Sequence, residues 1–204
     1  MELTRYISVA QRRPLTLDES QAHLLPLLEP LFLIDTHMFF EERVHLFKLA
    51  LALPEGFVAC EIGSYLGAST AFLAAAASLR GGHVHAVDTW QNDAMPHEPA
   101  ESTFERFQEN TQKFQQFITT HRGQAAALKD EVPAIDLLFI DGDHSYEGTK
   151  ANLTDYAGKL KPRGVLVLHD FTYATVSRAV RDSFKPDSLG DLGQVNSLQA
   201  FRVK

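Results

Sequence analysis

A short stretch after residue 134 places groups that can bind a metal or move a proton directly behind an apolar run. In IDLLFIDGDHSYEGTK, residues 135–150, the run 135–140 has one polar residue, and Asp141, Asp143 and His144 follow it. A buried strand has no structural need for two carboxylates and an imidazole at its end. A carboxylate is a hard ligand for a divalent cation, and imidazole titrates near pH 6.5, where a general base works. The sequence therefore predicts Asp141 and His144 as catalytic residues, with capping of the next helix as the alternative for His144.

A second polar pair follows another apolar run. VLVLH, residues 165–169, is typical of a strand, and His169 and Asp170 come at its end. The carboxyl ends of neighbouring parallel strands share one edge of a sheet, so we expect Asp170 beside Asp141, where two oxygen ligands can hold Mg²⁺. Imidazole favours softer ions such as Mn²⁺, Fe²⁺ or Zn²⁺. We predict Asp141, Asp170 and His169 as a metal set, with His169 either ligating or orienting the acids, and with a metal-free site left open.

The turn after the first apolar run contains glycine but lacks the dinucleotide pattern. In EIGSYLGAST, residues 61–70, Tyr65 occupies the position of the middle glycine of a G-x-G-x-x-G turn. A bulky side chain there opposes binding of a pyrophosphate, and the chain has no G-x-x-x-x-G-K-[ST] P-loop. The next run ends at Asp88, where a carboxylate can accept both ribose hydroxyls of an adenosine. This combination favours S-adenosylmethionine, and a tight turn without a ligand is the alternative.

Short apolar runs alternate with helical periodicity from residue 57 onward, which predicts βαβ units and a mostly parallel sheet covered on both faces. The expected strands are 57–62, 83–88, 117–123, 135–140, 165–169 and 197–203. The expected helices are 67–80, capped by Ser69 or Thr70, and 100–117, 148–160 and 174–184, with a turn at 161–164. Residues 1–55 have helical periodicity that Pro54 and Gly56 end, so we expect an N-terminal helical extension over 1–55 and one domain over 56–204.

Composition limits the cellular compartment and the kinds of binding partner that we expect. The net charge of -7 argues against a nucleic-acid partner, because neutralising phosphates needs a basic face. A single cysteine, Cys60, cannot form an internal disulfide, and the first residues contain no long apolar segment, so we expect no signal peptide and a cytoplasmic protein. The most apolar stretch, 24–34, is too short to cross a membrane. The apolar N-terminal helices either cover a sheet edge or pair with a second copy in a homo-oligomer.

Four segments together, EIGSYLGAST, VDTWQ, IDLLFIDGDHSYEG and LKPRGVLVLHDF, make residues 57–171 resemble class I S-adenosylmethionine-dependent methyltransferases. Within that class the chain resembles the small O-methyltransferase branch that includes catechol O-methyltransferase. It is more similar still to the macrolide-sugar O-methyltransferases and cephalosporin-hydroxylase-like proteins. The resemblance implies an α/β, Rossmann-like three-layer sandwich whose seven-stranded sheet is mostly parallel with an antiparallel last strand.

The resemblance also implies a set of cofactor-binding residues. It implies that the methionine part is surrounded by Glu61, Gly63, Ser64, Tyr65 and Ser69. Asp88 would bind the ribose, Trp90 would lie beside the adenine unless it is a core residue, and Gln124 would lie near the adenine edge. Asp141 would lie beside the cofactor.

Three functions follow as hypotheses. The leading one is S-adenosylmethionine-dependent O-methylation of a small hydroxylated molecule, with or without a divalent cation such as Mg²⁺ or Mn²⁺. The second is a protein that binds S-adenosylmethionine without catalysis. The third is a metal-dependent oxygenase in which His144, His169 and Asp170 surround Fe²⁺. Phe171 and Tyr173 next to the expected site suggest an acceptor that contains a ring.

Overall fold

A computed structural model describes residues 23–93 and 101–204 of the chain. Residues 1–22 of the expected N-terminal extension lie outside the described residues. The loop 94–100, part of the segment expected near the acceptor, lies outside them as well.

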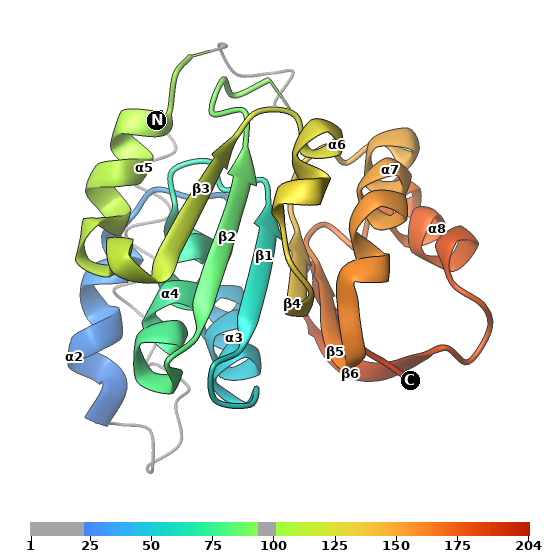
Figure 1. Cartoon of the computed structure of the whole chain (residues 1–204), viewed down its shortest axis with the longest axis horizontal. Coiled ribbons are helices and arrows are strands. Elements are labelled where there is room, and N and C mark those ends of the chain that lie inside the picture. The colour runs from blue at the N-terminus through green and yellow to red at the C-terminus, as the bar shows by residue number, and fades with distance from the viewer. Residues whose placement is uncertain (1–22, 94–100) are drawn as a thin grey trace.

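Seven strands form one sheet with the order β3-β2-β1-β4-β5-β7-β6 (Figure 1). The strands are β1 Val58–Ile62, β2 His83–Asp88, β3 Ile118–Arg122, β4 Ile135–Ile140, β5 Leu160–Leu168, β6 Leu189–Val195 and β7 Leu198–Val203. Strands β1 to β5 pair in parallel, and β7 runs antiparallel to both of its neighbours. The predicted α/β fold with a mostly parallel sheet and an antiparallel last strand is therefore confirmed.

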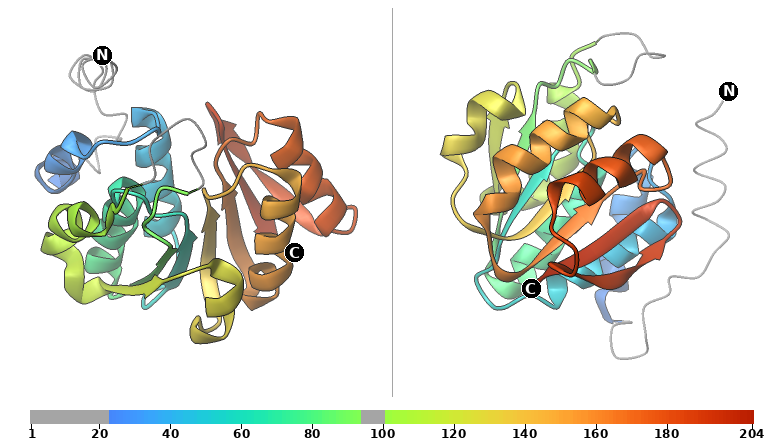
Figure 2. Two further views of the ribbon diagram at one scale, coloured as in Figure 1. Left: turned by 90° about the horizontal axis from the view of Figure 1, so that it is seen from above. Right: turned by 90° about the vertical axis from the view of Figure 1, so that its right-hand side faces the viewer.

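Helices cover both faces of the sheet, which gives three layers (Figure 2). One face carries α2 Leu25–Leu28, η2 Glu29–Leu33, α3 Phe40–Leu51, α4 Ala68–Arg80, α5 Phe104–Thr111 and η3 Gln112–Phe117. The other face carries α6 Ala125–Leu128, η4 Lys129–Glu131, α7 Tyr146–Tyr156, η5 Ala157–Lys159 and α8 Ala174–Ser183. The central strands are apolar on both sides because both of their faces lie under helices.

The described part of the N-terminal extension belongs to the larger of the two main cores. Residues of α3 such as Val44 and Phe47 are buried together with Phe72 of α4 and Phe139 of β4. Helix α4 is rich in alanine, and its small side chains let it pack closely against both α3 and β2, with residues 68–77 buried. Segment 23–55 thus shares one hydrophobic core with the sheet.

Three local expectations differ from the structure. Strand β6 was not predicted, because LGDLGQV is glycine-containing and polar and lacks an alternating apolar pattern. The expected turn at 161–164 lies within β5, where Arg163 adopts a φ of 65° and the pairing with β4 shifts its register. The expected helix 100–117 is shorter, because α5 begins at Phe104 and passes into a 3₁₀ helix at Gln112.

The start of helix α4 also differs from the expectation. Gly67, in the left-handed region at a φ of 85°, is the N-cap, and within the described residues no side chain caps the helix. The hydroxyl of Thr70 donates instead to Glu61 on β1. The hydroxyl of Ser69 also lowers the pKa of that carboxyl group. The two hydroxyls therefore interact with Glu61 at the edge of the sheet and do not cap helix α4.

Candidate functional site

The predicted side chains gather where four strands end. Backbone hydrogen bonds join the loops there: Asp141 N–H donates to Ile62 at 2.8 Å, Gly63 N–H to Val87 at 3.0 Å, and His169 N–H to Ile140 at 3.1 Å. Because each bond crosses from the loop of one strand to the last residues of its neighbour, the four loops form one continuous edge. The structure thus brings the acidic and imidazole groups of β4 and β5 next to the glycine turn of β1.

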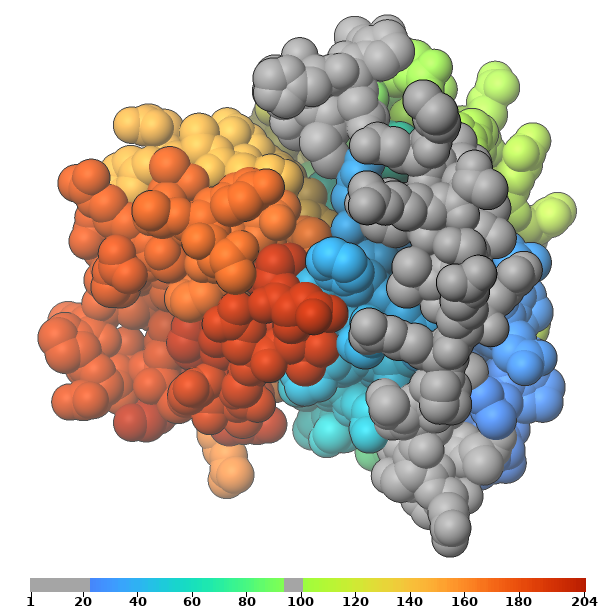
Figure 3. Space-filling view, turned by 180° about the vertical axis from the view of Figure 1, so that it is seen from behind, coloured from blue at the N-terminus to red at the C-terminus, as the bar shows by residue number. Residues whose placement is uncertain are grey.

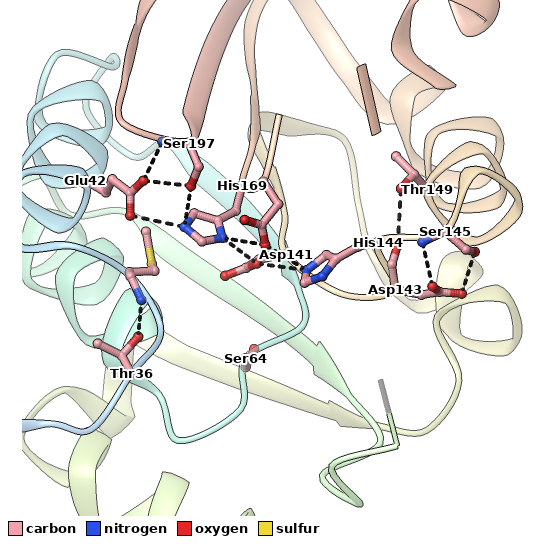
Figure 4. A network of polar contacts seen from close by, with 12 residues as sticks. Thr36, Glu42, Ser64, Asp141, Asp143, His144, Ser145, Thr149, His169 and Ser197 are labelled. Atoms are coloured by element: carbon pink, nitrogen blue, oxygen red, sulfur yellow. Dashed lines mark hydrogen bonds and ion pairs between the residues drawn. The ribbon is translucent and has the colours of Figure 1, made fainter. Parts of the chain in front are cut away.

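Asp141 and His144 point toward each other after the end of β4 (Figure 4). Asp170, after the end of β5, brings its carboxylate into the same group. His144 Nε2 lies 3.2 Å from Asp170 Oδ2 and 3.7 Å from Asp141 Oδ1, but neither contact has the geometry of a hydrogen bond. All three side chains are half-buried. Nε2 is therefore close to two carboxylates without being bonded to either, so it can approach a ligand placed between them.

The loop that carries His144 is fixed from both sides. Asp143 accepts from the backbone N–H of Ser145 at 2.8 Å and from its hydroxyl at 3.0 Å, as expected for a turn residue. The carbonyl of His144 accepts from Thr175 at 2.8 Å. Ser145, not His144, caps helix α7, since its Oγ accepts from Gly148 N–H at 3.0 Å. The imidazole of His144 thus has no capping role.

His169 is buried between two groups of oxygens. Its Nδ1 lies 3.1 Å from Asp141 Oδ1 and 3.3 Å from Asp170 Oδ2. Its Nε2 lies 3.1 Å from Glu42 Oε2 and 3.1 Å from Ser197 Oγ. Both ring nitrogens face protein oxygens, which is the arrangement of a residue that orients Asp141 and Asp170. The role of His169 as a direct metal ligand stays a prediction.

Three side chains have the geometry of a candidate cation site. Among the described residues, one group of three acidic or imidazole ligands has its ligand atoms within 4.8 Å of one another, namely Asp141, His144 and Asp170. Two carboxylate oxygens and one imidazole nitrogen suit Mn²⁺ or Fe²⁺ better than Mg²⁺, which prefers oxygen ligands alone. The residues present therefore fit a divalent cation.

Neighbouring charges shift the pKa values of His144, Asp141 and His169. The neighbouring Asp141 carboxylate raises the pKa of His144 above 6.5, and the charge of Asp170 adds to this, while burial and His169 oppose it. Burial alone would raise the pKa of Asp141, but His169 and His144 hold that pKa far below its ordinary range. For His169, the charge of Asp141 and its carboxylate contacts overcome burial and raise the pKa well above 6.5. Asp141 is therefore ionised at neutral pH.

The glycine turn lies directly against Asp141. Gly63 has a φ of 88°, and a Cβ atom there would collide with the backbone of Asp141 and Gly142. Asp88 holds the turn from the other side: its Oδ2 accepts from Ser64 N–H at 2.6 Å and Tyr65 N–H at 2.9 Å. The close approach explains why a residue without a side chain is needed at position 63.

Glu61 is fully buried next to this turn. Its Oε2 accepts from the hydroxyls of Ser64, at 2.7 Å, and Thr70, whereas Oε1 has no hydrogen-bond partner among the described residues. Burial raises the pKa of Glu61 to about 7, although the hydroxyls of Ser69, Thr70 and Ser64 oppose this. A buried carboxylate oxygen without a donor is expensive in free energy, so this atom has the capacity to accept a hydrogen bond from a ligand amine.

Two residues were expected near the adenine: Trp90, which packs among core rings, and Gln124, which is exposed. Trp90 is fully buried, its ring centroid lies 4.9 Å from that of Phe104 and 4.8 Å from that of Phe107, and its backbone N–H donates to Asp88 at 2.6 Å. Its packing is that of a core residue. Gln124 is exposed at the start of α6, and its amide donates to Asp93 at 3.3 Å. Contacts of Trp90 and Gln124 with an adenine stay predictions.

Three residues of the site were not identified from the sequence: Glu42, Thr70 and Ser197. Thr70 was expected only as a helix cap. Glu42 and Ser197 lie 155 residues apart and meet at His169. One local signal could have pointed to Glu42: it lies three residues after Phe39, and its carboxylate accepts from that residue's backbone N–H as in a capping box.

A family model described as a methyltransferase domain matches residues 60–171, which is more than half of the chain. An uncharacterised protein, y4gI of Sinorhizobium fredii, is 33% identical over 87 residues, which cover 42% of this chain. The chain spans about a tenth of the length of this curated relative, because the match covers 10% of it.

Solved structures share the fold at low sequence identity. The O-methyltransferase TomG of Streptomyces achromogenes, in complex with SAM, is 18% identical with a TM-score of 0.63, covering 100% of this chain and 99% of that one. An O-methyltransferase of Bacillus cereus in complex with SAH is 18% identical with a TM-score of 0.63, covering 98% and 97%. The TDP-rhamnose 3'-O-methyltransferase CalS11 is 17% identical with a TM-score of 0.61, covering 98% and 92%. Across residues 23–93 and 101–204, every helix is too short or too polar to span a bilayer.

Proposed function

We propose that this chain, which belongs to the methyltransferase-domain family, transfers a methyl group from S-adenosylmethionine to an oxygen atom of a small hydroxylated molecule. One observation carries the proposal. Asp141, His144 and Asp170 converge at the ends of β4 and β5, and the Gly63 turn lies directly against Asp141. A turn able to receive the cofactor and groups able to deprotonate an acceptor are thus next to each other.

The residues around the Gly63 turn fit S-adenosylmethionine. The cofactor has an ammonium group but no phosphate. Oε1 of the buried Glu61 has no partner in the described part of the chain, and it is an acceptor that suits an ammonium donor. Asp88 Oδ1 accepts one bond, from Trp90 N–H, and a carboxylate oxygen has capacity for a second donor such as a ribose hydroxyl. When bound, the cofactor supplies an electrophilic methyl group on a sulfonium.

The chain's own contribution is position and proton transfer. Holding two reactants in line can lower a barrier by roughly 7–11 kcal/mol. A hydroxyl group is a weak nucleophile until its proton is removed, and a positioned general base contributes about 10²- to 10⁴-fold to the rate. Nε2 of His144 has no hydrogen-bond partner among the described residues, so it can accept that proton. Asp170 and Asp141 then stabilise the resulting imidazolium.

A divalent cation would be held by Asp141, His144 and Asp170, and it would lower the pKa of a bound hydroxyl. The two roles of His144 exclude each other, because an imidazole nitrogen that ligates a cation has no lone pair left for a proton. Sensitivity of the reaction to a chelator therefore separates a metal-assisted site from a base-only site.

The oxygenase hypothesis receives less support. It requires a free ligand nitrogen on both His144 and His169, but both ring nitrogens of His169 lie within 3.3 Å of protein oxygens. The remaining residues, one imidazole and two carboxylates, do not make a set of two histidines and one carboxylate.

The acceptor is proposed to be a small ring-bearing hydroxylated molecule. Tyr173 is 52% exposed, and its ring centroid lies 5.9 Å from that of His144, so it offers an aromatic face beside the proton acceptor. The name of one structure with this fold, a TDP-rhamnose 3'-O-methyltransferase, adds sugar hydroxyls to the chemistry worth testing. A cytoplasmic location and a homo-oligomer stay predictions.

The test has two steps. Calorimetry should show that the purified chain binds S-adenosylmethionine, and no measurable affinity would remove the proposal. Release of S-adenosylhomocysteine should then be measured with a panel of catechols, phenols, hydroxylated alicyclic compounds and sugar nucleotides. His144→Ala should lower the turnover of the best acceptor about 100-fold or more while cofactor affinity stays unchanged. Tight cofactor binding with no transfer to any panel member would favour the non-catalytic hypothesis.

A further inference from the structure

We propose that Glu42, on helix α3, is a positioning residue of this site: it holds His169 so that His169 holds Asp141 and Asp170. The inference rests on the proposed function for its catalytic meaning, but the contacts themselves do not depend on it. Glu42 lies outside residues 60–171, the part that the family model matches. The N-terminal segment would thus supply part of the catalytic machinery.

Among the described residues, the carboxylate of Glu42 contacts Ser197, Phe39 and His169. Its side chain is 0% exposed. Its Oε1 accepts from the backbone N–H and the hydroxyl of Ser197, both at 2.8 Å. Its Oε2 accepts from Phe39 N–H at 2.7 Å and faces His169 Nε2 at 3.1 Å. A buried carboxylate is stable only with such a full set of donors, and one of them is the imidazole next to the site.

The imidazole of His169 transmits this restraint. Its ring is rigid and planar, so a group that fixes Nε2 on one edge also fixes Nδ1 on the other. Nδ1 lies 3.1 Å from Asp141 Oδ1 and 3.3 Å from Asp170 Oδ2. Figure 4 shows the resulting line of side chains, from Glu42 through His169 to Asp141 and on to His144.

Three distant segments meet at Glu42. Helix α3 supplies the carboxylate, the end of β5 supplies His169, and the turn between β6 and β7 supplies Ser197. In Figure 3 the red C-terminal segment lies against the blue segment that includes α3. The placement of helix α3 therefore sets the position of the imidazole of His169.

If Glu42 had a purely structural role, replacing it would leave the positions of Asp141, Asp170 and His144 unchanged. A capping box needs one carboxylate oxygen and is common at exposed helix ends, so it does not explain why Glu42 is buried against His169. Tying Ser197 to α3 does not explain the contact with His169 either. The test must therefore read out His144, which contacts Asp141 and Asp170 but has no contact with Glu42 among its described contacts.

The first experiment needs no acceptor. The ring ¹⁵N resonances of His144 and His169 are recorded by NMR in the wild-type chain, in Glu42→Gln and in Asp136→Asn, with assignment from His144→Gln and His169→Gln. We expect Glu42→Gln to shift the resonances of both rings. Unmoved His144 resonances in folded Glu42→Gln protein would overturn the proposal, whether or not the chain is a methyltransferase.

Asp136→Asn is the matched control. Asp136 is also a carboxylate that joins distant segments, since its Oδ2 accepts from Val58 N–H and from Lys161 Nζ, both at 2.8 Å. It lies at the amino end of β4, opposite the site, so its loss should destabilise the chain without shifting either ring. Should Glu42→Gln fail to fold, Ser197→Ala tests the same link, because its hydroxyl contacts both Glu42 and His169. Its folded form should shift both rings, and unmoved His144 resonances would overturn the proposal.

The second experiment uses the best acceptor of the panel. Loss of a partner that orients a ligand or catalytic group typically lowers activity about 10- to 100-fold, so kcat of Glu42→Gln should fall within that range with the KM for S-adenosylmethionine within twofold of wild type. The double variant Glu42→Gln/His169→Gln should be no slower than His169→Gln alone, because one residue acts through the other. Multiplying effects would overturn the proposal. Absence of transfer in the wild-type chain would instead count against the proposed function and leave the NMR result standing.

Discussion

The carboxylate of Asp88 accepts a hydrogen bond of 2.6 Å from the backbone N–H of Ser64, so the end of β2 holds the turn that follows β1. The same oxygen accepts from the N–H of Tyr65 at 2.9 Å. Tyr65 has a φ of 47°, which a side chain of its size rarely adopts, and such conformations persist only where surrounding contacts enforce them. Asp88 is therefore needed for the shape of the turn as well as for any contact with a ribose.

Replacing Asp88 with alanine should weaken both the fold and cofactor binding. Each buried donor left without an acceptor costs about 1–3 kcal/mol, so urea unfolding should show a loss of about 2 kcal/mol or more. Affinity for S-adenosylmethionine, measured by calorimetry, should fall at least about tenfold. Glu55→Ala is the control, because this side chain is 85% exposed and its ion pair with Arg80 is 3.9 Å long. An Asp88→Ala chain with wild-type stability and affinity would contradict the role of Asp88 in the turn.

Gly63→Ala should be far more damaging than Gly56→Ala. Both glycines have left-handed backbones, with φ of 88° at Gly63 and 69° at Gly56, so alanine adds backbone strain of roughly 1–2 kcal/mol at either position. At Gly56 a Cβ atom would have no atom of residues 23–93 or 101–204 within 4 Å, whereas at Gly63 it would collide with the backbone of Asp141 and Gly142.

Thermal unfolding and calorimetry of these two variants separate strain from collision. Gly56→Ala should show a modest drop in Tm with normal cofactor affinity. Gly63→Ala should lose cofactor binding, either in a folded chain or because the chain no longer folds. Equal behaviour of the two variants would mean that the turn after β1 does not press against Asp141.

Glu61 predicts a pH dependence of stability. Its pKa in the folded chain is raised to about 7 from an ordinary value of 4.5, so the folded chain holds this proton more tightly than the unfolded chain. The contribution of Glu61 to the free energy of unfolding is therefore fully present below pH 4.5 and is lost as the pH rises to about 7, by an amount on the order of 3 kcal/mol. Urea unfolding between pH 4.5 and 8 should show this loss in the wild-type chain and not in Glu61→Gln. Parallel curves for the two chains would show that Glu61 is already ionised in the fold.

The features that could be predicted from the sequence are those that residues close together in the chain determine. The apolar runs of β1, β4 and β5 and the polar residues after them predicted the strands, their shared edge and the neighbourhood of Asp141, His144 and Asp170. These features depend on residues next to each other in the chain. The neighbourhood could be predicted because parallel strands must end at one edge.

The features that were missed depend on long-range contacts. Strand β6 is polar and glycine-containing, and it is held by pairing with β7 and not by its own pattern. Glu42 reaches His169 across 127 residues of sequence, and no local periodicity marks a buried carboxylate as a partner of an imidazole. Trp90 could not be assigned from sequence either, because a core residue and an adenine contact look alike until Phe104 and Phe107 are placed around it.

The pH dependence of methyl transfer should identify the state of His144. A general base works when neutral, so kcat should rise with pH and level off above the pKa of His144, which the carboxylates of Asp141 and Asp170 raise above 6.5. In Asp170→Asn one raising charge is absent, so the rising limb should move to lower pH. Measurements in the presence of a chelator complete the test. Unchanged rates with the limb intact indicate a base-only site, whereas loss of activity that Mn²⁺ restores indicates that His144 ligates a cation. A limb that stays at the same pH in Asp170→Asn, with activity kept in chelator, would show that His144 is not the base.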